Sequence, residues 1–155
     1  MSVKVLFVGN PLAGDDGIGP HLYDELNDHP SLKNFDLVQS GVMGLDIIPS
    51  LKEDDRLLIV DAIRSKDGFG EVVLVGEKQI SSGFFPISPH DFGAEQTIKM
   101  VRALMPDFKE IQIIGVKINL TEEFKDSLSP ILQEKLPVIK EKVLESILKA
   151  TNNSK

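Results

Sequence analysis

The segment Leu57–Ile63 is apolar at every position except Asp61. An apolar run of this length is typical of a strand that is buried on both faces of a parallel sheet. Parallel strands need crossover connections, which are usually helices that cover the two faces of the sheet. The segment therefore predicts an α/β fold in which residues 57–63 form a central strand.

The other hydrophobic periodicities predict strands and helices that alternate along the chain. Strands are expected over 3–8, 35–39, 57–63, 71–75 and 111–116, and helices over 16–27, around 43–51, around 94–105 and from 130 onward. The strand over 71–75 follows its predecessor too closely for a crossover helix, so we expect it to be antiparallel. Pro137 is expected to kink or split the last helix. The pattern predicts a three-layer α/β/α fold, with an open, mostly parallel five-stranded sheet, one antiparallel strand and helices on both faces.

Length and charge narrow the class of protein. The 155 residues are enough for one domain, which we assign to residues 1–150, followed by a polar tail over 151–155. The net charge of −7 argues against general binding of nucleic acid and against docking on an anionic membrane, because both need a basic face. The chain has no cysteine, which excludes disulfides, thiolate catalysis and iron–sulfur ligation.

Neither a targeting signal nor a membrane span is visible in the sequence. The apolar run that begins at Val3 stops at Gly9, and no run approaches the roughly 20 residues that span a bilayer. We therefore expect a cytoplasmic protein, and we expect it to be a monomer.

A glycine-rich loop, Gly9–Gly19, separates the first strand from the first helix. It lacks the Gly-Lys-Ser/Thr ending and the Gly-x-Gly-x-x-Gly spacing of phosphate-binding loops. It also carries Asp15 and Asp16, and a carboxylate about 4 Å from a phosphate charge would cost about 4 kcal/mol at an effective dielectric near 20. The loop therefore suits a cation. Capping of the following helix is the alternative interpretation of the two aspartates.

Asp61 is a carboxylate within an apolar strand, where an unpaired charge is costly to bury. We expect it near the carboxyl end of a central strand, which is where open α/β sheets bind their ligands. The alternative is a structural aspartate that accepts hydrogen bonds from the backbone of a neighbouring loop.

A third candidate is His90, in the segment Ser88–Asp91. This segment has the form of an ordinary helix start, with a serine cap and a proline at the first helical position. A helix N-terminus disfavours imidazolium and leaves the neutral form, which binds metals. A parallel topology could bring Asp16, Asp61 and His90 to one crevice, and two carboxylates with one imidazole suit a divalent metal of hard or intermediate character.

These landmarks resemble the hydrogenase-maturation endopeptidases, which process the large subunit of nickel–iron hydrogenases. Gly9–Gly19 resembles the first motif of that family, Asp61 before an alanine matches its second acid, and His90 in Ser-Pro-His matches its histidine. The order and spacing of the three landmarks agree as well, and the resemblance runs from Val3 to about Leu148.

The resemblance implies an endopeptidase that removes the C-terminal peptide of a nickel-loaded hydrogenase large-subunit precursor. Asp16, Asp61 and His90 would be its catalytic and metal-contacting residues. The nickel would come from the precursor, with other divalent metals able to take its place, and a precursor without metal would not be cut. Gly41 and Gly44 lie where many relatives have a Gly-Gly-Thr/Ser-x-Gly loop, and we expect them to let an extended substrate peptide approach the backbone.

The residues alone leave other functions open. A divalent-metal (nickel) chaperone without peptidase activity would use the same three side chains. A nucleotide binder or phosphotransferase would show stabilisation by nucleotide, although the acidic loop argues against it. A purely structural domain would respond to neither metal nor substrate.

Overall fold

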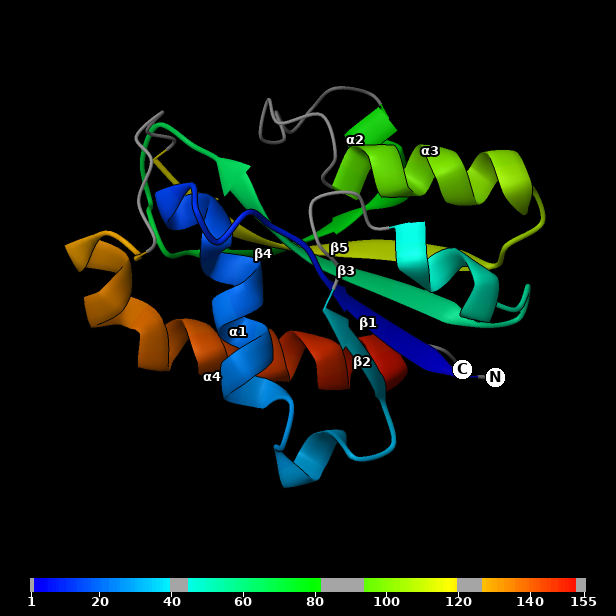
Figure 1. Cartoon of the computed structure of the whole chain (residues 1–155), viewed down its shortest axis with the longest axis horizontal. Helices are drawn as coiled ribbons and strands as arrows, with labels where there is room; N and C mark the ends of the chain where they lie inside the picture. Colours follow the sequence, from blue (N-terminus) through cyan, green and yellow to red (C-terminus); the bar gives the residue numbers. More distant parts are fainter. Residues whose placement is uncertain (1, 40–44, 82–93, 120–126, 153–155) are drawn as a thin grey trace.

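The computed structural model describes residues 2–39, 45–81, 94–119 and 127–152. Within these residues the chain forms a five-stranded sheet with the order β2-β1-β3-β5-β4 (Figure 1). The strands are β1 (Val3–Phe7), β2 (Asp36–Gln39), β3 (Arg56–Arg64), β4 (Val72–Gly76) and β5 (Glu110–Ile118). β2, β1, β3 and β5 run parallel, whereas β4 pairs with β5 in the antiparallel direction. The mostly parallel sheet and its single antiparallel strand are therefore confirmed.

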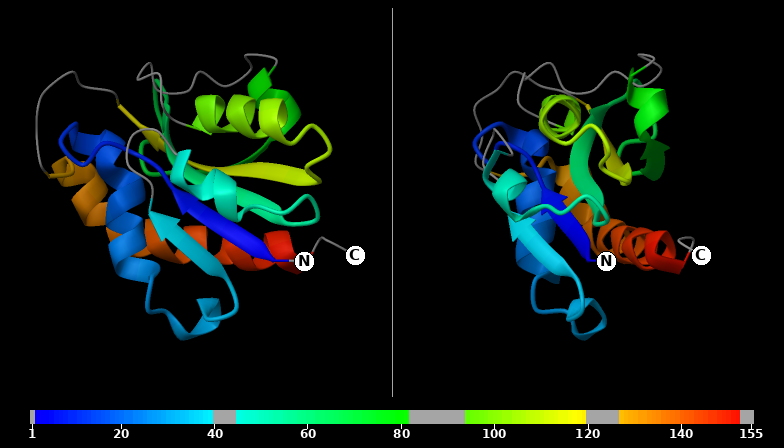
Figure 2. Two further views of the ribbon diagram at one scale, coloured as in Figure 1. Left: turned by 45° about the vertical axis from the view of Figure 1, so that its right-hand side comes forward. Right: turned by 90° about the vertical axis from the view of Figure 1, so that its right-hand side faces the viewer.

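Helices cover both faces of this sheet, as Figures 1 and 2 show. One face carries α1 (Ile18–Leu26) and α4 (Pro130–Asn152), and the other carries α3 (Ala94–Leu104) and the 3-10 segment η3 (Leu45–Ser50). The shorter elements are η1 (Gly14–Gly17), η2 (Pro30–Leu32) and α2 (Glu77–Ser81). The predicted three-layer α/β/α architecture is confirmed.

The alternation of side chains along the central strands divides the core into two halves. The half under α1 and α4 includes Val5, Phe7, Leu58, Val60, Leu22, Ile139 and Val143. The half under α3 includes Leu6, Val8, Leu57, Ile59, Ile98 and Val101. Because consecutive residues of β1 and β3 fill opposite halves, neither strand keeps a polar face, and this is why the segment 57–63 reads as a continuous apolar run.

Some boundaries differ from the sequence-based expectation. The first helix begins at Ile18 rather than at Asp16, because residues 14–17 form the separate turn η1. α4 contains Pro137 without being split, and it runs to Asn152, two residues beyond the expected domain boundary. Within the described residues, no helix combines the length and apolar character needed to cross a lipid bilayer.

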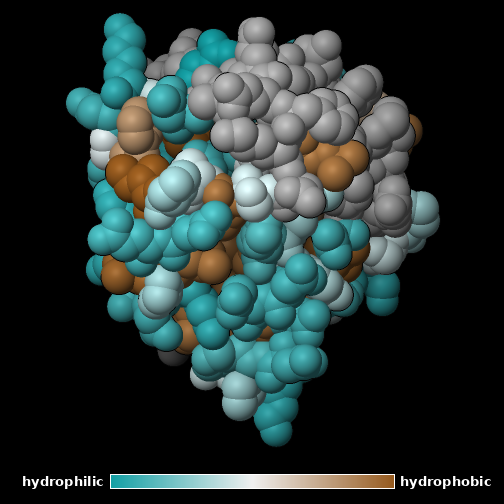
Figure 3. All heavy atoms as spheres, turned by 60° about the vertical axis from the view of Figure 1, so that its left-hand side comes forward, coloured by the Kyte–Doolittle hydropathy of each residue, from teal (hydrophilic) through white to brown (hydrophobic). Residues whose placement is uncertain are grey.

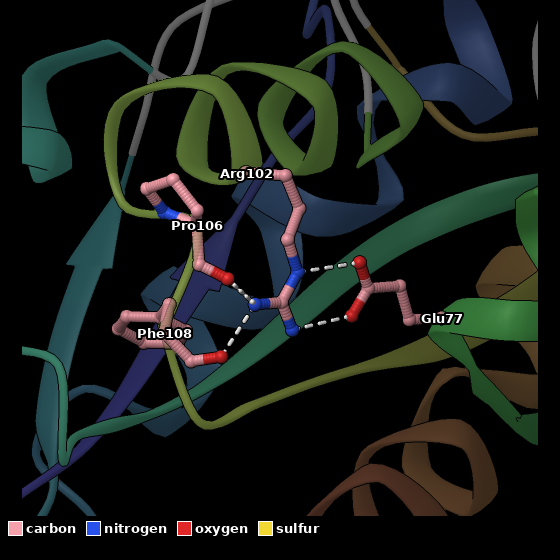
Figure 4. A network of polar contacts seen from close by, with 4 residues as sticks. All are labelled: Glu77, Arg102, Pro106 and Phe108. Carbon is pink, nitrogen blue, oxygen red and sulfur yellow. Dashed lines mark hydrogen bonds and ion pairs between the residues drawn. The ribbon is translucent and has the colours of Figure 1, made fainter.

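A polar cluster fastens the end of α3 to the rest of its layer (Figure 4). The Arg102 guanidinium donates two hydrogen bonds of 2.7 Å to the Glu77 carboxylate at the start of α2. It also donates to the backbone carbonyl of Phe108, just before β5. A bidentate arginine–carboxylate pair holds both groups in one plane, so this cluster fixes the helix whose other end reaches the candidate site.

Candidate active site

The candidate site lies at the point where the sheet changes its direction of winding. From β1 the chain passes through α1 to β2 on one side, and it then returns to β3 on the other side of β1. At such a switch point the connections after two neighbouring strands diverge and leave a crevice beyond the carboxyl ends of the strands, where open α/β proteins bind ligands. The loop after β1 and the end of β3 both reach this point, because the last residue of β1, Phe7, pairs with Val60.

Glycines allow the loop after β1 to fold back tightly on the end of its own strand. Gly9 has a φ of +155°, and a Cβ atom there would lie 2.3 Å from the backbone oxygen of Asp16. A Cβ atom on Gly19 would lie 2.1 Å from the backbone oxygen of Val8. Side chains at these positions are therefore excluded by backbone contacts, and the packing places η1 directly above the end of β1.

Asp15 and Asp16 are neighbours in η1, but they bind different partners. The Oδ2 atom of Asp16 accepts a 3.2 Å hydrogen bond from the Asn10 backbone N–H, and the residue is 4% exposed. Asp15 accepts hydrogen bonds from the backbone N–H and the hydroxyl of Ser129, at 2.6 and 2.8 Å. In the described part of the chain no side chain caps α1, whose N-cap residue is Gly17. The interpretation of these aspartates as caps of the following helix is therefore wrong.

Asp61 lies on β3, one residue beyond the pairing with β1, and is 2% exposed. Its two carboxylate oxygens accept hydrogen bonds from the backbone N–H groups of Ala62, at 2.8 Å, and of Ala94, at 3.0 Å. Ala94 is the first residue of α3, so Asp61 also stabilises the start of that helix. The structural role considered for this aspartate is therefore present, and any chemical role must be additional to it.

The electrostatics of Asp61 show that its backbone partners do not compensate for its burial. Burial, together with the nearby Asp16 carboxylate, raises the pKa of the Asp61 carboxyl from 3.8 to about 7, against the lowering effect of the Ala94 and Ala62 N–H groups. Two carboxylates thus share a water-poor site at the switch point. Within the described ranges, no group of three or more acidic, histidine or cysteine side chains could hold a metal ion. His90, Gly41 and Gly44 lie outside the described residues.

Several hydrogen-bond partners in this site could not be predicted from the sequence. The N–H of Ala94 and the hydroxyl of Ser129 belong to segments 33 and 114 residues away from the aspartates that they bind. Asn10 could have been suspected, because it lies inside the glycine-rich loop, where its side chain also accepts a 2.9 Å hydrogen bond from Leu12 N–H. Hydrogen bonds between such distant segments leave no periodic pattern in a sequence.

A hollow of about 490 Å³ opens beside Asp15, on the side of the molecule where α4 begins. Figure 3 views the molecule with that side turned forward, and apolar residues reach the surface there among hydrophilic ones. The walls of the hollow include Gly14, Phe69, Ser129 and Ile131. The hollow therefore adjoins the loop that carries Asp16, although Asp16 and Asp61 do not line it.

Comparison with known proteins shows the family of this chain. The family model described as hydrogenase maturation protease (HycI) matches residues 20–146. The chain belongs to the hydrogenase maturation protease family. It is therefore an endopeptidase, as the resemblance of the three landmarks implied, and its switch-point crevice is the candidate active site of a peptidase.

Individual relatives agree with this assignment along most of the chain. The hydrogenase 2 maturation protease of Escherichia coli is 27% identical over 95% of this chain and 96% of its own length. The NiFe hydrogenase maturation protease HybD from Thermococcus kodakarensis has a TM-score of 0.74 at 26% identity, covering 95% of this chain and 99% of that one. The hydrogenase maturating endopeptidase HybD from E. coli has the same fold, with a TM-score of 0.75 at 24% identity over 97% and 94% of the two chains.

The raised pKa of Asp61 predicts a specific dependence of stability on pH. Because this pKa is higher in the folded protein than in the unfolded chain, its contribution to stability is complete below about pH 4 and is lost as the pH rises through about 7. Asp61→Asn has no charge to bury. Between pH 4 and 7.5 its free energy of unfolding should therefore rise relative to wild type by a few kcal/mol. Urea unfolding of both proteins across this range measures the difference, and a constant difference would contradict the prediction.

Proposed function

We propose that this protein removes the C-terminal peptide from a nickel-loaded precursor of a nickel–iron hydrogenase large subunit, and that Asp16 and Asp61 bind the nickel of that substrate. The observation that carries the proposal is the pair of buried carboxylates at the switch point, in which Asp61 has a pKa of about 7. The relatives are named as proteases of hydrogenase maturation, which supports the class of substrate.

A divalent cation would relieve the electrostatic cost of this carboxylate pair. Burial and the charge of Asp16 both disfavour ionised Asp61, and a cation between them would offset both effects. The carboxylates keep lone pairs for a metal, since the three oxygens that accept a described backbone hydrogen bond can each accept more than one. The site therefore gains from binding a metal that arrives with the substrate.

His90 is the third metal contact in this proposal. It precedes Ala94, whose N–H donates to Asp61, by four residues. Four residues of extended chain span at most roughly 14 Å, so this sequence separation allows the imidazole to reach the carboxylates. An imidazole with two carboxylates suits nickel, which accepts both nitrogen and oxygen ligands.

Positioning is the main source of catalysis in this proposal. Nickel that is fixed both to the precursor and to the protease would hold the scissile bond in one place, and it could polarise the peptide carbonyl or a water molecule. The chain has no cysteine that could act as a nucleophile. Gly41 and Gly44 follow β2 in the sequence, and we propose that they let the extended precursor peptide run close to the backbone. The cytoplasmic location and the monomeric state stay predictions.

The decisive experiment mixes the protein with nickel-loaded and nickel-free forms of a hydrogenase large-subunit precursor and measures the masses of the products. We expect loss of a C-terminal peptide from the loaded form only, and we expect His90→Ala to abolish it. Equal cleavage of both forms would contradict nickel recognition. Intact precursors with nickel bound to the protein would instead favour metal binding without hydrolysis.

A further inference from the structure

Asp15 joins the loop of the candidate site to the start of α4. Its two carboxylate oxygens accept hydrogen bonds from the backbone N–H and the hydroxyl of Ser129, at 2.6 and 2.8 Å. Asp15 is only 8% exposed, so water competes little for these bonds. Ser129 directly precedes α4, and its carbonyl accepts the N–H of Gln133 in the first turn of the helix. A carboxylate is favoured at this position, because free backbone N–H groups and the positive end of the helix dipole lie there.

The two sides of this contact differ in how firmly they are held. α4 is anchored by the buried side chains of Leu132, Ile139 and Val143, which pack into the core under the sheet. η1 is a single turn of four residues with a glycine at each end and no side-chain cap. Within the described parts of the chain, the Asp16 carboxylate accepts one hydrogen bond, the 3.2 Å contact from Asn10 N–H. The bond from Asp15 to Ser129 therefore ties a short turn to a well-packed helix, immediately beside Asp16.

We infer that Asp15 is a positioning residue, which holds Asp16 in register with Asp61 by fixing η1 to the start of α4. This inference rests on the proposed function, in which Asp16 and Asp61 bind the nickel of the substrate. Asp15 itself is assigned no contact with nickel or with the peptide. A displacement of about 1 Å in a catalytic group can cost roughly 10²-fold in rate, so the loss of this tie should appear in catalysis as well as in folding.

Asp55 provides a matched control at the amino end of the central strand β3. It is 2% exposed and accepts two backbone hydrogen bonds, from Ser2 N–H at 3.0 Å and from Lys52 N–H at 2.9 Å. It directly precedes β3, at the end of that strand away from Asp61. Asp55→Ala thus removes another buried carboxylate that accepts two hydrogen bonds, without touching the candidate site.

The test compares kcat and KM for a nickel-loaded precursor, with each kcat expressed per folded molecule from a parallel unfolding curve. Asp15→Ala should lower kcat by about 10–100-fold and leave KM within about threefold, whereas Asp55→Ala should leave both unchanged. Asp15→Asn should stay within about threefold of wild type, because its amide oxygen can accept the Ser129 N–H while its NH₂ group donates to the hydroxyl. Ser129→Ala removes only the hydrogen bond of the hydroxyl group, so its kcat should lie between those of Asp15→Asn and Asp15→Ala.

The possible failures can be told apart. If wild type cuts the loaded precursor and Asp15→Ala keeps the kcat of Asp55→Ala, Asp15 is only a helix cap and the inference is wrong. A rise in KM with kcat unchanged would also overturn it, because that pattern indicates lost binding of substrate rather than misplaced catalytic groups. If wild type cuts neither form of the precursor, the proposed function fails and this inference falls with it.

Discussion

Asp61→Asn is expected to lower the kcat for cleavage of a nickel-loaded precursor by about 10²–10³-fold while the protein stays folded. The amide has no charge to bind nickel, and one of its two ends carries N–H groups. That end must face the backbone N–H of Ala62 or Ala94, so one existing hydrogen bond is lost as well. The variant no longer buries a charge beside Asp16 and should therefore be the more stable protein at neutral pH. Higher stability with lower activity would mark Asp61 as a residue kept for function.

Asp55→Asn is the control, because it makes the same substitution at the other end of β3. Both aspartates are 2% exposed, and each accepts two backbone N–H groups. Asp55→Asn should therefore lose a comparable hydrogen bond and keep its kcat. The measurement is single-turnover cleavage followed by mass spectrometry, with Asp16→Asn as a second test variant. If Asp61→Asn cleaves the precursor at the same rate as Asp55→Asn, Asp61 has no catalytic role.

Gly19→Ala is expected to destabilise the protein by roughly 2–4 kcal/mol. In an ordinary helix, replacing glycine by alanine stabilises the protein by up to about 1 kcal/mol. The change in stability expected for Gly19→Ala therefore has the opposite sign. The added Cβ atom would lie 2.1 Å from the backbone oxygen of Val8, and a backbone atom cannot move aside as a flexible side chain can. Pro20 adds to the cost, since its ring crowds the Cβ atom of a preceding residue in the helical conformation.

Gly76→Ala is the matched control for this substitution. Among the described residues, a Cβ atom at Gly76 would meet only the Gln79 side chain, at 3.8 Å, which is ordinary contact. Its urea midpoint should stay close to that of wild type, while the midpoint of Gly19→Ala should fall clearly. If the two variants unfold at the same urea concentration, the packing of α1 against the end of β1 does not need a glycine. The shape of the crevice would then not depend on the glycine at position 19.

Most of the fold could be predicted, because strands buried on both faces leave a strong local pattern. The strand expected over 57–63 is β3, the helix expected around 94–105 is α3, and the strand expected over 71–75 is antiparallel. The prediction was weaker where tertiary contacts override local preference. Asp16 was expected inside the first helix, but the close approach of the loop to the end of β1 makes residues 14–17 a separate turn.

The candidate site divides in the same way. Asp16 and Asp61 could be chosen from the sequence, since a carboxylate in an apolar strand and a pair of acids in a glycine-rich loop are both costly unless something binds them. The choice of nickel came from resemblance to a family. His90 is a candidate both from its place at an expected helix start and from that resemblance, and nickel and the role of His90 stay predictions.

The sequence by itself determined the five strands, the main helices and the family, and it singled out Asp16 and Asp61 as candidate site residues, because each of these depends on residues that are close together in the chain. Only the tertiary structure decided that Asp15 holds the start of α4 while Asp16 affects the pKa of Asp61, and that Asp61 also binds the start of α3. Those contacts join segments that are far apart in sequence. The free-energy cost of an ionised carboxylate depends on how deeply the fold buries it and on which groups the fold places beside it.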